Sequence, residues 1–199
     1  MSLDTTIALI NEEEYRDFAG IDTDKDINEE QLALLINSAS QFIIDFTGRK
    51  FIAGTHTHIF GGDGERNYFV PYPPLTADAT LYYKYGYDPS DSDYWKDASD
   101  NYYFTQANDT GEMYFTDGTV FNKGQQNWRI IYSYGYARAS IPSDLKKACF
   151  ELVHLARKHV MDNAFGLQSK SVAGTTTSYE FTKIPQNVLE TLNRYKRVG

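Results

Sequence analysis

Residues 134–159 constrain the fold of this chain more than any other stretch. An aromatic segment ends at Gly135, Pro142 follows, and an uninterrupted helical pattern comes next. Proline fixes φ and lacks an N–H that a first helical turn would leave unpaired, so Pro142 suits a helix start. Apolar residues then recur at three- and four-residue steps, which predicts a long amphipathic helix over 143–164. This stripe consists of Leu145, Cys149, Leu152, Leu155, Ala156 and His159.

A second long helix is predicted after Asn28. Asn28 can cap its first turn, and Gly48 can end it in a left-handed conformation. Its apolar stripe needs a partner of similar length, and the 143–164 helix is the obvious one. The stripe consists of Leu32, Leu35, Ile36, Ala39, Phe42, Ile43 and Phe46.

Two shorter helices are predicted nearer the ends of the chain. Asn11 followed by Glu14 has the spacing of a capping box, and Gly20 ends that helix. Pro185 opens the last helix, which has a basic final turn. Its apolar face consists of Val188, Leu189, Leu192 and Tyr195. The preceding segment 167–177 is rich in Ser, Thr and Gly and lacks apolar periodicity, so we expect it to be mobile or ordered only by a partner.

Between residues 51 and 137 the periodicity changes from helical to extended. About six short aromatic strands are separated by glycines and prolines. Residues 56–60 and 67–70 flank a glycine-rich segment and are predicted to form a hairpin. Residues 87–100 are polar and acidic, and we expect a loop or an extended tip there.

These elements predict an α+β protein. Residues 1–50 and 139–199 would form a small bundle of about four helices with a C-terminal arm. Residues 51–138 would form an inserted small antiparallel β-sheet or barrel.

The composition argues against several classes of function. A net charge of −8 suits a protein that does not grip nucleic-acid phosphates, because that affinity comes mainly from Lys and Arg. The single cysteine, Cys149, allows no disulfide within the chain and is expected to be a buried packing residue rather than a nucleophile. The N-terminus has no basic leader, and no apolar run approaches the roughly 20 residues of a membrane span. We therefore expect a cytoplasmically made protein with no membrane association.

Fragments of known chemical sites are present, but each is incomplete. Residues 22–26 alternate aspartates as a calcium loop does, yet Ile27 stands where that loop needs glycine. His56 and His58 share one side of a strand without a third metal ligand in the pattern. The glycines at 61–64 lack the Lys-Ser/Thr of a phosphate loop. The sequence therefore predicts no metal, no cofactor and no catalytic residue.

The order of these elements resembles the head–tail connector (head-completion or adaptor) proteins of tailed bacteriophages. The resemblance spans most of the chain in order. It is carried by a short first helix ending at Gly20, a long helix closing in Thr47-Gly48-Arg49-Lys50, Tyr132-Ser133-Tyr134-Gly135-Tyr136-Ala137, the helix opening Ile141-Pro142-Ser143-Asp144-Leu145-Lys146-Lys147-Ala148, and the loop Gly166-Leu167-Gln168-Ser169.

That resemblance implies a structural virion protein and not an enzyme. Such a protein would form a ring of twelve subunits under the portal, extend the DNA channel and join head to tail. Its partners would be the portal protein, a downstream connector or tail-terminator protein, and further copies of itself. It would be found in the host cytoplasm during assembly, where it can be a monomer, and then at the head–tail interface of the virion. DNA would pass through the channel without specific binding.

The resemblance also directs attention to two sets of contact residues. The set expected to contact the portal is Gly166, Leu167, Tyr179, Phe181, Leu189, Leu192, Arg194, Tyr195 and Arg197. The set expected to face the tail or a neighbouring subunit is Tyr87, Tyr94, Trp95 and Tyr102.

Two other classes remain open from the residues alone. Tyrosines and Trp95 on a surface would also suit a carbohydrate-binding or tail-fibre-like module. The many carboxylates would suit a hydrolase if two of them met in a cleft.

Overall fold

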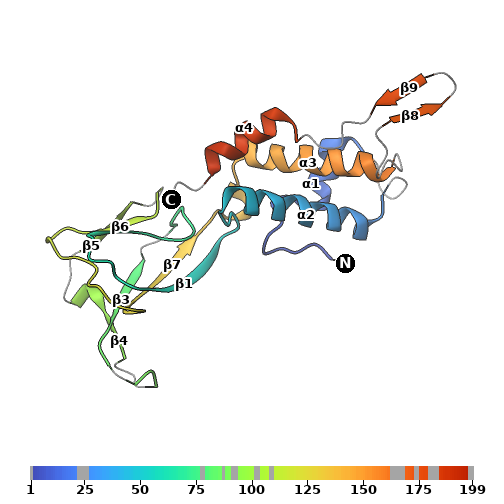
Figure 1. The fold of residues 1–199 in the computed structure, drawn as a ribbon. Helices are drawn as coiled ribbons and strands as arrows, with labels where there is room; N and C mark the ends of the chain where they lie inside the picture. The colour runs from blue at the N-terminus through green and yellow to red at the C-terminus, as the bar shows by residue number, and fades with distance from the viewer. Residues whose placement is uncertain are drawn as a thin grey trace. The chain divides into compact units, whose positions relative to one another are not determined.

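A computed structural model describes residues 2–21, 27–76, 79–86, 88–90, 94–100, 104–107, 110–161, 169–172, 175–178 and 184–196. The chain divides into two compact units: residues 1–48 with 141–198, and residues 49–140 with residue 199 (Figure 1). We call them the helical unit and the β unit. Within the described residues there are four α-helices and several antiparallel sheets, which confirms the predicted α+β class.

The helical unit is built on two long helices. They are α2 (Glu29–Thr47) and α3 (Ser143–Met161), which pack on each other as predicted. The shorter helices α1 (Glu12–Ala19) and α4 (Gln186–Tyr195) each contact both of them. Two further strands, β8 (Ser169–Val172) and β9 (Thr175–Ser178), form an antiparallel hairpin. The strands lie almost entirely within 167–177, and the expectation that this segment is mobile or ordered only by a partner stays a prediction.

The predicted helix ends are confirmed by their capping bonds. The Asn11 side chain accepts a 2.7 Å bond from the Glu14 amide, and the Glu14 carboxylate accepts a 2.9 Å bond from the Asn11 amide. At α2 the Asn28 side chain accepts a bond from the Gln31 amide. Gly48 ends α2 with a left-handed φ of 67°, a conformation that glycine adopts without strain.

The buried face of α2 does not coincide with its apolar stripe. Leu35, Phe42 and Phe46 belong to the stripe but are only half-buried, whereas Ser40 and Thr47 are fully buried. Their hydroxyls are satisfied: Ser40 Oγ accepts a bond from the Leu9 amide, and Thr47 Oγ1 donates to the Ile43 carbonyl. A satisfied hydroxyl can be buried at little cost, so periodicity of apolar residues alone missed this face.

Cys149 is a packing residue of this core, as predicted. Its Sγ lies 3.6 Å from Ser40 Oγ, and burial raises the pKa of the thiol to about 12. The side chain therefore stays protonated and unreactive at neutral pH.

The β unit contains two antiparallel sheets. Strands β1 (Gly54–Phe60), β7 (Trp128–Tyr134), β3 (Thr80–Lys84) and β4 (Trp95–Asp97) form the four-stranded sheet in that order. Strands β2 (Asn67–Phe69), β6 (Glu112–Phe115) and β5 (Phe104–Ala107) form the three-stranded sheet. The sheets are open in the described residues, so the sheet form of the prediction holds and the barrel form does not. β4 and the short 3₁₀ helix after it also correct the expectation of a loop throughout 87–100.

The predicted hairpin between residues 56–60 and 67–70 is wrong. β1 pairs with β7 and β2 pairs with β6, so the two segments enter different sheets. The glycines between them serve a close backbone approach instead of a tight turn. A Cβ added at Gly62 would collide with the backbone of Phe121 and Asn122, and the Gly64 amide donates to the Phe121 carbonyl at 2.9 Å.

An aromatic cluster fills the space between the two sheets. Phe60 stacks on Tyr68 with ring centroids 3.6 Å apart, which joins β1 to β2 through side chains. Trp128 lies against Phe115 and Phe121 at centroid distances of 5.8 and 5.2 Å. These side chains explain much of the aromatic excess of the sequence, because large rings fill such a core with few residues.

His56 lies at the edge of this cluster and provides a pH-sensitive feature of the β unit. Its ring meets Tyr72 and Tyr132 edge-on at 4.9 and 5.7 Å. Burial, and then the nearby charges of His58 and Lys50, lower the pKa of His56 below its ordinary value of 6.5. The contribution of neutral His56 to stability is therefore complete above pH 6.5 and is lost as the pH falls through the lowered pKa.

We expect the melting temperature of the β unit to fall between pH 7 and pH 5, in part because of His56. Thermal unfolding followed by near-ultraviolet circular dichroism at several pH values measures this effect. The variant His56→Gln does not titrate, so its melting temperature should change less over the same range. An identical pH dependence in both proteins would show that His56 is not responsible.

Candidate partner-binding surfaces

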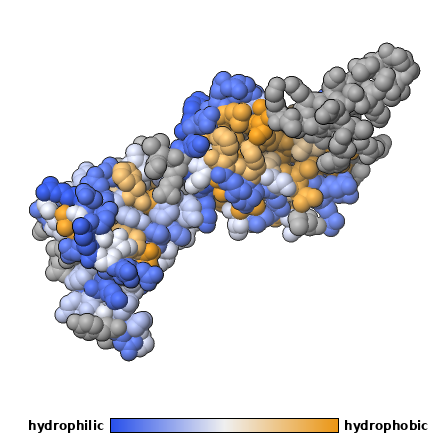
Figure 2. All heavy atoms as spheres, viewed as in Figure 1, coloured by the Kyte–Doolittle hydropathy of each residue, from blue (hydrophilic) through white to orange (hydrophobic). Residues whose placement is uncertain are grey.

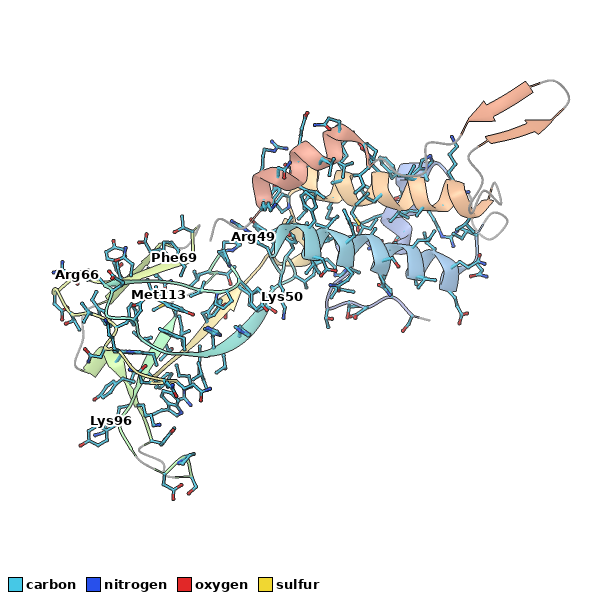
Figure 3. All side chains as sticks on the ribbon, in the orientation of Figure 1. Arg49, Lys50, Arg66, Phe69, Lys96 and Met113 are labelled. Atoms are coloured by element: carbon cyan, nitrogen blue, oxygen red, sulfur yellow. The ribbon has the colours of Figure 1, made fainter. Side chains whose placement is uncertain are left out.

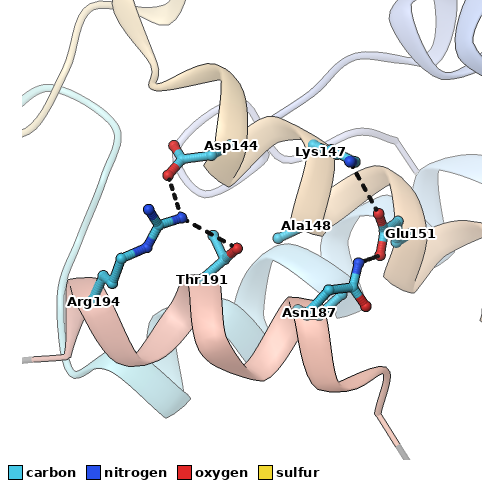
Figure 4. A pocket seen from close by; sticks show the side chains of 8 residues that line it. Asp144, Lys147, Ala148, Glu151, Asn187, Thr191 and Arg194 are labelled. Carbon is cyan, nitrogen blue, oxygen red and sulfur yellow. Dashed lines mark hydrogen bonds and ion pairs between the residues drawn. The ribbon is translucent and has the colours of Figure 1, made fainter.

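The first candidate surface is the junction of α3 and α4, which contains most of the described residues expected to contact a portal. A polar groove there is lined by Asp144, Lys147, Ala148, Glu151, Asn187, Val188, Thr191 and Arg194 (Figure 4). At one end, Asp144 accepts bonds from Arg194 at 3.0 Å and from the Tyr195 hydroxyl at 2.8 Å. At the other end, Asn187 donates to Glu151 at 2.6 Å. These bonds fasten both ends of α4 to α3.

Helix α4 is thus an integral part of the helical unit. Val188 and Leu192 are 1% and 0% exposed beneath it, and Lys196 Nζ lies 5.7 Å from the ring centre of Phe46. The apolar periodicity of α4 indicates this packing in the sequence, because a helix with one strongly apolar face packs on another element. The division of 139–199 into a helical core and a C-terminal arm stays a prediction.

The α4 residues that were expected to contact a portal differ in how accessible they are to a partner. Leu192 is enclosed in the helical unit and is not accessible to a partner in this conformation, whereas Leu189 and Tyr195 are half-buried and Arg194 is exposed. The remaining members of that set lie outside the described residues; they are Gly166, Leu167, Tyr179, Phe181 and Arg197.

The second candidate surface is the outer face of the four-stranded sheet. The guanidinium carbon of Arg129 lies 4.3 Å from the ring centre of Tyr82 and 4.9 Å from that of Trp95. The register places Ile59 beside Arg129 and Arg129 beside Tyr82, so one row of side chains crosses β1, β7 and β3. Trp95 and Tyr94 were expected to face the tail, and both are half-buried here. Tyr87 and Tyr102, the other two members of that set, lie outside the described residues.

Sequence reasoning did not single out the outer face of the three-stranded sheet. Phe69 of β2 is 50% exposed and Tyr114 of β6 is 38% exposed, while Met113, the residue before Tyr114 in β6, is fully buried. Phe69 and Met113 are labelled in Figure 3. Exposure alternates along β2 and β6, but apolar residues occupy both faces of these strands, so their sequences carry no alternation that could have found this aromatic face.

Among the described residues, no group of three or more His, Cys, Asp and Glu side chains is placed to share a metal ion. None of the described helices is long and apolar enough to cross a bilayer.

The chain matches a known protein family over most of its length. A family model described as "Head completion protein" matches residues 8–198. The chain belongs to the head completion protein family. The resemblance to head–tail connector proteins that the sequence carries is thereby confirmed. No curated protein sequence matches the chain.

Three solved structures with this fold come from gene transfer agent (GTA) particles. One is a chain in "Neck of empty GTA particle computed with C6 symmetry", with a TM-score of 0.66, 14% identity, and coverage of 100% of this chain and 95% of that one. A second is from "Neck of native GTA particle computed with C12 symmetry", with a TM-score of 0.60, 15% identity, and coverage of 98% and 91%. A third is from "Virion of native gene transfer agent (GTA) particle", with a TM-score of 0.60, 14% identity, and coverage of 100% and 94%. At these identities the likeness establishes the fold.

The geometry of the head completion protein does not favour the two alternative classes. The carboxylates of Asp144 and Glu151 line one groove, but each is already bound by partners on α4, unlike a catalytic pair that faces a substrate. Trp95 is stacked with Arg129, so its place in the fold is explained without a sugar.

Proposed function

We propose that this head completion protein forms a ring of twelve subunits under the portal vertex, extends the DNA channel and joins head to tail. The family match over residues 8–198 carries the proposal. The fold supports it, because one solved neck with this fold was determined with C12 symmetry. The protein would act without catalysis, first in the host cytoplasm and then at the head–tail interface of the virion.

We assign the portal contact to the exposed side of α4 and to the segments before and after it. Arg194 offers a cation there, with 66% of its side chain exposed, and Leu189 and Tyr195 offer partly exposed apolar area. Gly166, Leu167, Tyr179, Phe181 and Arg197 stay predicted members of this contact. Leu192 acts only by holding α4 in place.

We assign the tail-side contact to the outer face of the four-stranded sheet, around Trp95. Aromatic and arginine side chains dominate the energetics of protein interfaces, and Tyr82, Trp95 and Arg129 gather there. The partner would be a downstream connector or a tail-terminator protein. Tyr87, Tyr94 and Tyr102 stay predicted members of the same contact.

The charge of the chain suits a channel through which DNA passes without binding. A net charge of −8 per subunit is repeated around a ring, and like charge repels the phosphate backbone.

Complementation of incomplete heads tests this function directly. DNA-filled heads are purified from a producer strain in which the gene for this chain is inactivated, and the purified protein and tails are added. Joined particles counted by electron microscopy should appear with the wild-type protein. Trp95→Ala should bind the heads and yet reduce joining by about tenfold or more, the cost of losing one aromatic anchor. Joining of heads and tails at the same yield without the protein would refute the proposed function.

A further inference from the structure

The helical unit has an apolar groove that the described residues leave uncovered. It is lined by Leu35, Ser38, Ala39 and Phe42 of α2 and by Leu152, Leu155 and Ala156 of α3. Apolar residues gather on this unit in Figure 2. Helix α4 covers α3 from Asp144 to Glu151, and the groove begins at the next residue.

The groove combines two buried core residues, Ala39 and Leu152, with the edges of the helical stripes. Leu35, Phe42, Leu155 and Ala156 have helical spacing to the core residues but stay only half-buried. A contiguous apolar groove on a soluble unit is typical of an interaction site.

A protruding aromatic pair lies on the other flank of α3. Phe18 of α1 is 48% exposed and stacks on Phe150 with ring centroids 4.6 Å apart. Phe150 and Leu152 are separated by about 200° around the helix, and Phe150 and Leu155 by about 140°. The groove and the pair therefore face roughly opposite directions within the same unit.

The charge beside the aromatic pair on α3 is positive, and the charge beside the groove on α2 is negative. These two sides are therefore complementary. On α3 the neighbours of Phe150 at one helical turn include Lys147, whose side chain is 68% exposed and lies 3.9 Å from Glu151. The charged residues of α2 are all acidic, and Asp45 stands one turn after Phe42 of the groove. On α1 Asp17 accompanies Phe18, so the complementarity belongs to the α3 side of the pair.

From these features we infer that the groove binds the Phe18–Phe150 pair of a second copy of this chain. The contact joins each subunit to the next one in the ring through two different patches, and it rests on the proposed ring. A ring of more than two subunits needs two different, complementary patches on each subunit. In a two-fold dimer, by contrast, the same patch of both subunits is in contact. The groove and the aromatic pair, concave and convex on opposite flanks, meet that need.

Two charge-introducing variants and a matched control test the contact. Leu155→Glu changes the groove and Phe18→Glu changes the pair. Leu34→Glu changes an α2 leucine that is 47% exposed and does not line the groove. Sedimentation velocity with portal rings of the same particle measures the bound mass. Wild type and Leu34→Glu should fill the portal, and the other two should assemble about thirtyfold more weakly.

Mixing the two defective variants on portal rings gives the sharper result. Each retains the patch that the other lacks, so the mixture should bind the portal as one-to-one dimers at concentrations at which neither variant alone adds mass. Circular dichroism establishes that each variant is folded. Ser38→Trp, which fills the groove from an exposed position, replaces Leu155→Glu if that variant unfolds.

Each remaining outcome overturns the contact. Wild-type rings formed by both defective variants would place the subunit contact elsewhere and leave the proposed function standing. An absence of mixed dimers would show that the two patches do not meet. Failure of the wild-type protein itself to add mass to the portal would overturn both the contact and the proposed function.

Discussion

Trp128→Ala is expected to lower the free energy of unfolding of the β unit by about 3–5 kcal/mol, the usual cost of removing a large buried aromatic side chain. Trp128 is 1% exposed, and its ring touches Phe115, Phe121 and Tyr83. Its Nε1 also donates to the Asn122 carbonyl at 3.4 Å. The midpoint of urea unfolding should therefore fall by about 1 M or more.

The other tryptophan of the chain is the matched control. Trp95 is half-buried on the outer face of the four-stranded sheet, where Arg129 stacks on it. Trp95→Ala should cost only about 0.5–1 kcal/mol, the usual value of such a cation–aromatic contact near solvent. Equal destabilisation by both substitutions would contradict the placement of Trp128 in the core and Trp95 on the surface.

Removal of residues 184–199 is expected to destabilise the helical unit by about 4 kcal/mol or more. The truncation deletes α4 and exposes the surface that Val188 and Leu192 cover, and truncating one such aliphatic side chain alone costs about 2–5 kcal/mol. It also removes the partners of Asp144 and Glu151. Far-ultraviolet circular dichroism during urea unfolding measures the loss.

Failure of the truncated chain to bind a portal would therefore be no proof of a direct contact. Arg194→Glu separates the two effects, because an exposed ion pair contributes about 0–1 kcal/mol to folding. We expect this variant to fold and to lose portal binding. Unfolding of the truncated chain at the same urea concentration as the full-length chain would contradict the structural role of α4.

The local features of the fold could be predicted from the sequence because their causes are local. The capping box at Asn11 and Glu14 and the glycine at position 48 need only neighbouring residues to act. The pairing of β1 with β7 brings together strands far apart in the chain, and the glycines at 61–64 gave a misleading local signal for a hairpin. Buried Ser40 was missed because its bond to the Leu9 amide depends on tertiary structure.

The candidate surfaces were harder to predict for the same reason. The resemblance identified the family, and the stripe positions Leu35 and Leu155 were recognised as apolar. Periodicity could not show that these edges of two stripes meet in an uncovered groove. Nor could it show that Leu192 packs inside the unit while Arg194 of the same helix faces solvent.

The most direct test of the central claim is the mass of the complex between this protein and the portal ring of its particle. Light scattering coupled to size exclusion should give an added mass of one copy of the 22.7 kDa chain for each portal subunit. No added mass at high protein concentration, with a portal preparation that still supports DNA packaging, would contradict the connector account.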